Sequence, residues 1–316
     1  PTFQDKRLRD YCLALFSKAK DPRAVVTRLE GDNRSYVNIA ASYGLDDLLK
    51  RFYKTDPTAF DEIFESSSRA SPPLLHAAWS HHDTTQWIAD RVKDPIGRAR
   101  DDWPAIAGPI QRGRRDIFDV LMAAARTKVN GQSLEELLRC PNQTSLLHHA
   151  AWAGFLEFVE SLHKDHGFAV NQPEHRGLLP LHYTCYQDKI ESFDYLRSVC
   201  DVNALAESSK LHCLHIAAAN GSSKVLDRLL RLPETSNCLG IEDSDGWTAL
   251  GHAARYRHAD CVAALQKFAD PNSGKVSPLH LLLSYVPGAT EAENLVPRPD
   301  RQPFEHIRKL LKETDR

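Results

Sequence analysis

Residue types that could do chemistry gather in TSLLHHAAWAGFLEFVESL, residues 144–162, where His148 and His149 are adjacent. Histidine is both an acid–base group near neutral pH and a common metal ligand. The segments HKDH at 163–166 and LHCLH at 211–215 also combine ligand types, as do His182 and Cys185 in HYTC. None forms a repeated C-x₂-C or an H-E-x-x-H arrangement, which are typical of zinc sites. We therefore expect no metal ion and no cofactor.

Catalytic motifs are equally scarce. The sequence contains no G-x-S-x-G, no phosphate-binding P-loop and no G-x-G-x-x-G. We expect no catalytic residues and a chain that is not an enzyme. A basic cluster lies in GRARDD and QRGRRD, with Arg98, Arg100, Arg112, Arg114 and Arg115. It has two interpretations, a solvated face or a contact for phosphate or an acidic peptide.

Length and composition narrow the class of protein. The chain has 316 residues, enough for two ordinary domains or one elongated one, and a net charge of −2. A charge so close to zero favours neither nucleic acid nor a membrane as partner. The longest apolar stretch, LHLLLSYV at 279–286, is too short to cross a bilayer, and the polar start PTFQDKRLRD does not resemble a signal peptide.

The cysteine content indicates a reducing compartment. Seven cysteines are present, an odd number, and no C-x-x-C occurs. This pattern argues against a disulfide framework. We expect the protein in the cytoplasm or nucleus, or in a host cytosol if it is delivered there.

An internal period organises the second half of the chain. His182 lies 34 residues after His148, and His215 lies 33 residues further on. Gly251 takes the equivalent place 36 residues later, and His280 follows 29 residues after that. Each of these five positions is preceded by an apolar residue and Leu and is followed by small residues. A second apolar run with helical spacing comes next in each unit.

These units resemble the ankyrin repeat family, whose motif is TPLHxAA, a variable pair, Gly and an outer helix. The resemblance covers about residues 140–285. It rests on LLHHAAWAG at 146–154, LPLH at 179–182, CLHIAAANG at 213–221, DGWTAL at 245–250, SPLH at 277–280, and the turns FAVNQ at 168–172 and CDVNA at 200–204.

The resemblance implies an all-α solenoid of about eight helix-turn-helix repeats with short hairpin loops. We expect an N-terminal helical cap at 1–34, divergent repeats 1–3 at 35–140, and repeats 4–8 at 141–316 with an inserted loop at 286–302 and a final helix at 303–314. The third repeat has Pro109 and Ile110 in place of the alanines, and a proline there should disturb the helix. Ser133 and Glu136 predict a capping box and an extra helical turn in an insertion.

The family pattern assigns structural roles to most of the motif. The alanines let successive inner helices approach, the Leu before the His fills the core, and the His is a hydrogen-bonding residue at the start of the inner helix. His148, His182, His215 and His280 are then architecture. His149 and Trp152 share a helical face, and the resemblance places that face in the concave groove.

The family's variable positions, after the alanines and at the hairpin tips, are rich in aromatic and basic residues here. Exposed aromatic residues in a row mark contact sites. We expect a protein or peptide partner, preferably acidic, on the concave face. The predicted binding residues are Trp79, Arg112, His149, Trp152, Tyr183, Tyr186, Arg176, Lys210, Trp247, Arg255 and Tyr256.

Two other functions remain open at this point. The groove could be the pocket of an enzyme or a small-molecule binder, with His76, His149 and Tyr183 as acid–base groups. The chain could also be the sensor or scaffold part of a larger protein.

Overall fold

The computed structural model describes residues 40–55, 73–79, 81–92, 94–98, 102–129 and 131–268, and the secondary structure within these ranges is helical. None of the described helices is both long and apolar enough to cross a membrane. The chain divides into two compact units, Pro1–Pro141 and Asn142–Arg316. Each unit is described by itself.

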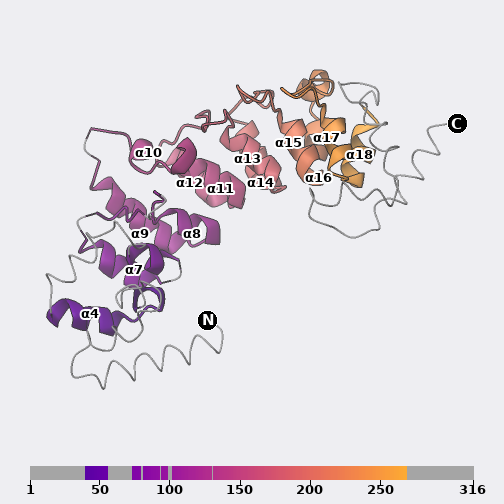
Figure 1. Cartoon of the computed structure of the whole chain (residues 1–316). Coiled ribbons are helices and arrows are strands. Elements are labelled where there is room, and N and C mark those ends of the chain that lie inside the picture. The colour runs from indigo at the N-terminus through magenta and orange to yellow at the C-terminus, as the bar shows by residue number, and fades with distance from the viewer. Residues whose placement is uncertain are drawn as a thin grey trace. The chain divides into compact units, whose positions relative to one another are not determined.

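The first unit is built from helix pairs (Figure 1). Its helices are α4 (Asp46–Thr55), α6 (Pro73–Ala78), α7 (His82–Ala89), α8 (Ala107–Arg112), α9 (Arg115–Arg126) and α10 (Leu134–Leu137). Helices α6 and α7 form one pair and α8 and α9 the next, and α6 packs on α8 while α7 packs on α9. Ala77 and Ala78 are fully buried at this stacking contact, as the repeat pattern predicts.

Two irregular parts of the first unit have clear local causes. Pro109 is the third residue of α8, where its missing N–H has no partner within the helix to lose. The helix therefore forms, and the expected disturbance does not occur. The predicted capping box of the insertion is confirmed. The Ser133 hydroxyl accepts from the Glu136 N–H at 3.1 Å, and the Glu136 carboxylate accepts from the Ser133 N–H at 3.1 Å.

In the described part of the second unit, residues 142–268, one helix pair occurs four times (Figure 1). The inner helices are α11 (Leu146–Ala153), α13 (Pro180–Tyr186), α15 (Cys213–Asn220) and α17 (Ala249–Arg255). The outer helices are α12 (Leu156–Lys164), α14 (Ile190–Arg197), α16 (Ser223–Leu230) and α18 (Ala259–Leu265). Short 3₁₀ turns, η1 (Pro141–Gln143) and η2 (Pro233–Cys238), lie in the connections. Each inner helix contacts the next inner helix, and each outer helix contacts the next outer helix.

The core of this unit lies between successive pairs. Ala150, Ala217 and Ala253 are fully buried where inner helices meet, as the sequence predicts. Cys185 takes an alanine position in α13 and is also fully buried. Small side chains let the helix backbones come close, and the outer helices contribute large ones such as Phe158 and Phe193. Since no single pair encloses this core, stacking is what stabilises it.

Several expectations fall outside the described residues. These are the N-terminal cap at 1–34, the repeat around His280, the inserted loop at 286–302 and the final helix at 303–314. The side chain of His76 also lies outside them.

Candidate binding face

The repeated histidines are part of the architecture, as predicted. His148, His182 and His215 are fully buried. Nδ1 of each accepts from the backbone N–H three residues earlier, at 2.9–3.1 Å. Nε2 of each lies 2.9–3.2 Å from the carbonyl oxygen of Leu178, Ala204 or Ile241 in the following connection. Because Nδ1 is an acceptor, the proton resides on Nε2, which donates to that carbonyl. Each imidazole thus joins its helix start to the next repeat.

Burial keeps these imidazoles neutral. Loss of solvation lowers the pKa of His148 to about 3 and that of His182 to about 4, although the bonds to Leu178 and Ala204 work the other way. It also lowers the pKa of His215. A protonated ring could not accept from the backbone N–H through Nδ1, so the neutral form is the one that fits.

Two hairpins of the second unit each enclose a buried carboxylate. Glu174 accepts from the N–H groups of Arg176 at 3.1 Å and Leu178 at 3.4 Å. Asp243 accepts from the N–H groups two and four residues later, those of Asp245 and Trp247, each at 2.9 Å. Both acids hold the same loop geometry, in which Gly177 and Gly246 have φ of 82° and 84°. The two loops are therefore structural equivalents.

Each carboxylate also fixes a second side chain. Glu174 contacts Nε of Arg176 at 3.3 Å and Nδ1 of His175 at 2.6 Å. Asp243 lies 2.7 Å from Nε2 of His252 on α17. Burial alone would raise the pKa of Asp243, but the bonds from Trp247 and His252 lower it overall. The carboxylate is thus held ionised.

Aromatic side chains occupy the exposed positions of the inner helices. The term inner-helix face is used here for Trp152, Tyr183, Tyr186, Arg255 and Tyr256. Trp152 is 42% exposed and Tyr256 39% exposed, whereas Ala150 of α11 and Ala253 of α17 are fully buried. Tyr183 and Tyr186 are half-buried, with ring centroids 6.0 Å apart. The guanidinium of Arg255 lies 5.0 Å from the Trp247 ring and 5.7 Å from the Tyr256 ring.

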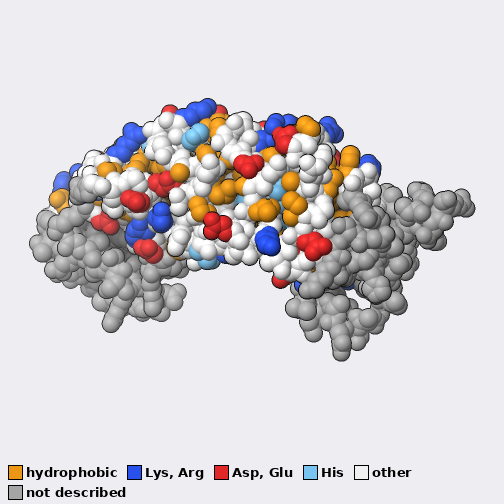
Figure 2. All heavy atoms as spheres, turned by 90° about the horizontal axis from the view of Figure 1, so that it is seen from above, with side chains coloured by type: hydrophobic (Ala, Val, Ile, Leu, Met, Phe, Trp, Pro, Cys, Tyr) orange, Lys and Arg blue, Asp and Glu red, His pale blue; other side chains and the backbone are white. Residues whose placement is uncertain are grey.

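Between the tyrosines of α13 and α17, helix α15 presents smaller side chains. Ile216 is buried, and Ala219 stands at the position that Tyr186 takes in α13. Figure 2 shows one face of the molecule, on which hydrophobic, basic and acidic side chains are interspersed rather than sorted by charge.

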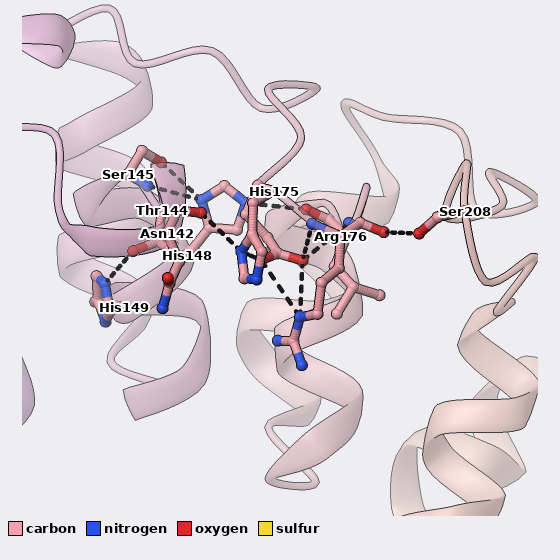
Figure 3. A network of polar contacts seen from close by, with 10 residues as sticks. Asn142, Thr144, Ser145, His148, His149, His175, Arg176 and Ser208 are labelled. Atoms are coloured by element: carbon pink, nitrogen blue, oxygen red, sulfur yellow. Dashed lines mark hydrogen bonds and ion pairs between the residues drawn. The ribbon is translucent and has the colours of Figure 1, made fainter.

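The predicted binding residues do not share one environment. His149 is only 8% exposed, and its Nε2 lies 3.0 Å from the Thr144 hydroxyl (Figure 3), so it presents little surface. Burial lowers its pKa to about 4. Arg176 and Lys210 are exposed on the hairpins, and Trp247 is half-buried at the end of its hairpin. Trp152, Tyr183, Tyr186 and Arg255 therefore lie on the inner helices, whereas Arg176 and Lys210 lie on the hairpins.

The predicted residues of the first unit form a pair of their own. The Arg112 guanidinium lies 4.5 Å from the Trp79 ring, and Trp79 is exposed. Three other arginines of the basic cluster make contacts within the protein, and Arg100 lies outside the described residues. Arg98 donates to the carbonyls of Leu137 and Arg139, while Arg114 and Arg115 pair with Asp116 and Asp119. These pairs favour the solvated-face interpretation of the cluster.

Sequence reasoning missed the buried acid Glu174 and did not predict that Asp243 is buried. A signal was present, because each stands three residues before a glycine and closely precedes an inner helix. His163, one of the residues considered above as a metal ligand, is hydrogen-bonded through Nδ1 to the Tyr195 hydroxyl at 2.7 Å. Among the described residues, no three His, Cys, Asp or Glu side chains are placed to hold a metal ion.

Comparison with known proteins agrees with this repeat geometry. A family model described as ankyrin repeats (3 copies) matches residues 214–292. The chain is 27% identical over 119 residues to "Ankyrin repeat domain-containing protein SAT10" of Stachybotrys chartarum, a match covering 38% of this chain and 6% of that protein. It is 25% identical over 183 residues to the human "Transient receptor potential cation channel subfamily A member 1", covering 57% of this chain and 16% of that protein.

The matched region therefore spans a small share of both relatives. The helix pairs described before and within the matched residues stack in the same way, with small buried side chains where the inner helices meet. The chain contains ankyrin repeats at residues 214–292, where the family model matches.

Proposed function

We propose that this chain binds a polypeptide partner through the inner-helix face of its second unit. Ankyrin repeats typically mediate protein–protein interaction. The observation that carries the proposal is the exposure of Trp152 and Tyr256 on helices whose other faces are buried in the stack. Packing of the repeats leaves these rings uncovered, so the fold does not account for their presence.

Aromatic side chains at such positions suit protein recognition. They supply a large contact area with few rotatable bonds, and they dominate the binding energy of many interfaces. Arg255 beside Trp247 and Tyr256 adds a guanidinium whose planar donors bind carboxylates well. The face thus combines apolar anchors with basic groups.

The alternative of a catalytic groove gains no support from its candidate acid–base groups. Burial lowers the pKa of His149 to about 4. Burial also raises the pKa of Tyr183, although its bond to Arg176 works the other way. General acid–base catalysis works best with a pKa near the working pH. Burial moves the pKa of His149 below that range and keeps the pKa of Tyr183 above it.

The proposal is tested with peptides selected from a random display library on the purified chain. The strongest binder is then measured by calorimetry against Trp152→Ala and against Glu191→Ala, an exposed change on the outer helix α14. Truncating a central aromatic typically costs about 2 kcal/mol, roughly a 30-fold loss of affinity. We expect that loss for Trp152→Ala and unchanged affinity for Glu191→Ala. Equal affinities for the two folded variants would place the binding site elsewhere.

A further inference from the structure

Arg176 is an exposed cation whose side chain is held in place by a buried carboxylate. Its side chain is 55% exposed, yet its Nε lies 3.3 and 3.4 Å from the two oxygens of the buried Glu174 carboxylate. Tyr183 is also close to Arg176, since each group affects the pKa of the other. Figure 3 shows the terminal nitrogens of Arg176 pointing away from the contacts made by Nε. A guanidinium has five N–H donors, so this arrangement leaves donors to present outward.

The hairpin that carries Arg176 is itself well anchored. The Ser208 hydroxyl of the next hairpin donates to the Arg176 carbonyl at 2.9 Å (Figure 3). His175 Nδ1 lies 2.9 Å from the Asn142 carbonyl oxygen. A Cβ on Gly177 would come within 2.6 Å of the Glu207 nitrogen, so adjacent hairpins are in close contact. An anchored guanidinium loses less conformational entropy on binding than a free one.

The surroundings of Arg176 are aromatic on one side. Tyr183 is close enough to Arg176 for each to affect the pKa of the other, and its ring is next to that of Tyr186. Burial is the main cause of the raised pKa of Tyr186, while the charge of Arg176 lowers this pKa and that of Glu174 raises it. Both phenols are therefore neutral at physiological pH and can donate a hydrogen bond to an anion. The exposed acid Glu207 belongs to the next hairpin, and the exposed acid Asp245 to the hairpin after that.

The paired carboxylate does not cancel the site's preference for an anion. The Glu174 side chain is fully buried, and two backbone N–H groups, His175 and Arg176 already surround it. An incoming ligand meets the guanidinium and the phenols instead. A carboxylate fits the planar donors of arginine, whereas a second cation would be repelled.

We propose that Arg176, Tyr183 and Tyr186 form a subsite for one aspartate or glutamate side chain of a bound polypeptide. Arg176 and the Tyr183 hydroxyl bind the carboxylate, the Tyr186 ring covers the adjacent apolar part of the segment, and Glu174 positions Arg176. This inference rests on the proposed polypeptide-binding function and adds the chemistry of one recognised residue.

The test is a selection from a random twelve-residue peptide library, displayed with its C-terminus fused so that every carboxylate is a side chain. The full chain, Arg176→Gln and Arg231→Gln are compared. Arg231 is an exposed arginine just after the outer helix α16 and controls for the loss of one charge. Tyr183→Phe keeps the ring and removes the hydroxyl. Thermal unfolding confirms that each variant is folded.

We expect the full chain and Arg231→Gln to enrich peptides with Asp or Glu at one fixed position beside an apolar residue. Arg176→Gln should lose that enrichment and bind the selected peptide at least about tenfold more weakly, as expected for a hydrogen bond to a charged group. Tyr183→Phe should weaken binding less.

The failures of the two proposals can be told apart. Peptides selected without an acidic preference, or with one that survives in Arg176→Gln, would overturn the subsite and leave polypeptide binding intact. Selection of no peptide by the full chain would overturn both.

Discussion

In three repeats of the second unit, one imidazole joins the start of the inner helix to the next connection, and only its neutral form can make both hydrogen bonds. His148, His182 and His215 accept through Nδ1 and lie with Nε2 against a carbonyl. Protonation would place a second N–H against a backbone N–H. The folded state must therefore keep these rings neutral, and stability becomes linked to pH.

The pH dependence has a definite sign. In the unfolded chain each ring takes up a proton near pH 6.5, whereas burial lowers the folded pKa of His182 to about 4 and that of His148 to about 3. The stabilising contribution is full above pH 6.5 and is lost as the pH falls toward 4. Each such ring then costs up to about 1.4 kcal/mol per pH unit. Urea unfolding between pH 7.5 and 4.5 should show this fall.

The control is His182→Gln, which removes one of these rings. Its unfolding free energy should fall less steeply between pH 6 and 5, by about the slope that one proton gives. A slope equal to that of the unchanged chain would mean that His182 is not neutral in the folded state.

The structural residues were easier to predict than the binding residues, for a physical reason. Alanines and histidines such as Ala217 and His182 recur at the same positions of several repeats, so the period of the sequence reveals them. His149 and Trp152 also share a face, but a neighbouring Thr144 hydroxyl covers one and leaves the other open. That difference depends on the local loop. Glu174 was missed because its partners are backbone N–H groups of its own hairpin.

At the scale of elements, the loop after one inner helix also caps the start of the outer helix in the next repeat. Asp188 follows α13 with φ of 54°, a conformation unfavourable for most residues other than Gly, Asn and Asp. Its Oδ1 accepts from the Val225 N–H in the first turn of α16 at 2.9 Å. A carboxylate at a helix start satisfies a free N–H and complements the helix dipole. This contact couples two repeats.

Asp188→Ala should therefore destabilise the second unit. Loss of the N–H acceptor costs about 1 kcal/mol, and alanine in the left-handed region adds about 1 kcal/mol more. Asp188→Asn keeps an acceptor and tolerates the backbone, so it should cost less. Denaturant midpoints measure both. An alanine variant as stable as the asparagine variant would show that Asp188 does not cap α16.

The sequence predicted helix pairs better than their connections. The period located the helices of the second unit, since apolar residues at helical spacing must face a core. It did not predict the turn η2 before the Asp243 hairpin, which lies in the interval of 36 residues between His215 and Gly251. It also overstated the effect of Pro109, because the first residue of α8 was not predictable and the proline lies in the first turn.

At the scale of the molecule, stability depends on contacts between neighbouring repeats. Ala217 is fully buried in α15, which packs against α13 on one side and α17 on the other. Ala217→Leu should overpack that contact and cost about 1–3 kcal/mol. Ala219→Leu, a half-buried position on the same helix, is the matched control and should change stability little. Equal unfolding midpoints for the two variants would mean that the inner helices do not meet at Ala217.

The central claim, that a polypeptide lies on the inner-helix face, is tested most directly by site-specific photo-crosslinking. The photoreactive amino acid benzoylphenylalanine replaces Tyr186 on the inner helix α13 or Tyr195 on the outer helix α14 of the same repeat. Both tyrosines are half-buried, so the two probes are matched in residue type and burial. The selected peptide should crosslink to position 186 and not to position 195. Crosslinking at 195 with none at 186 would place the partner on the outer helices and contradict the account.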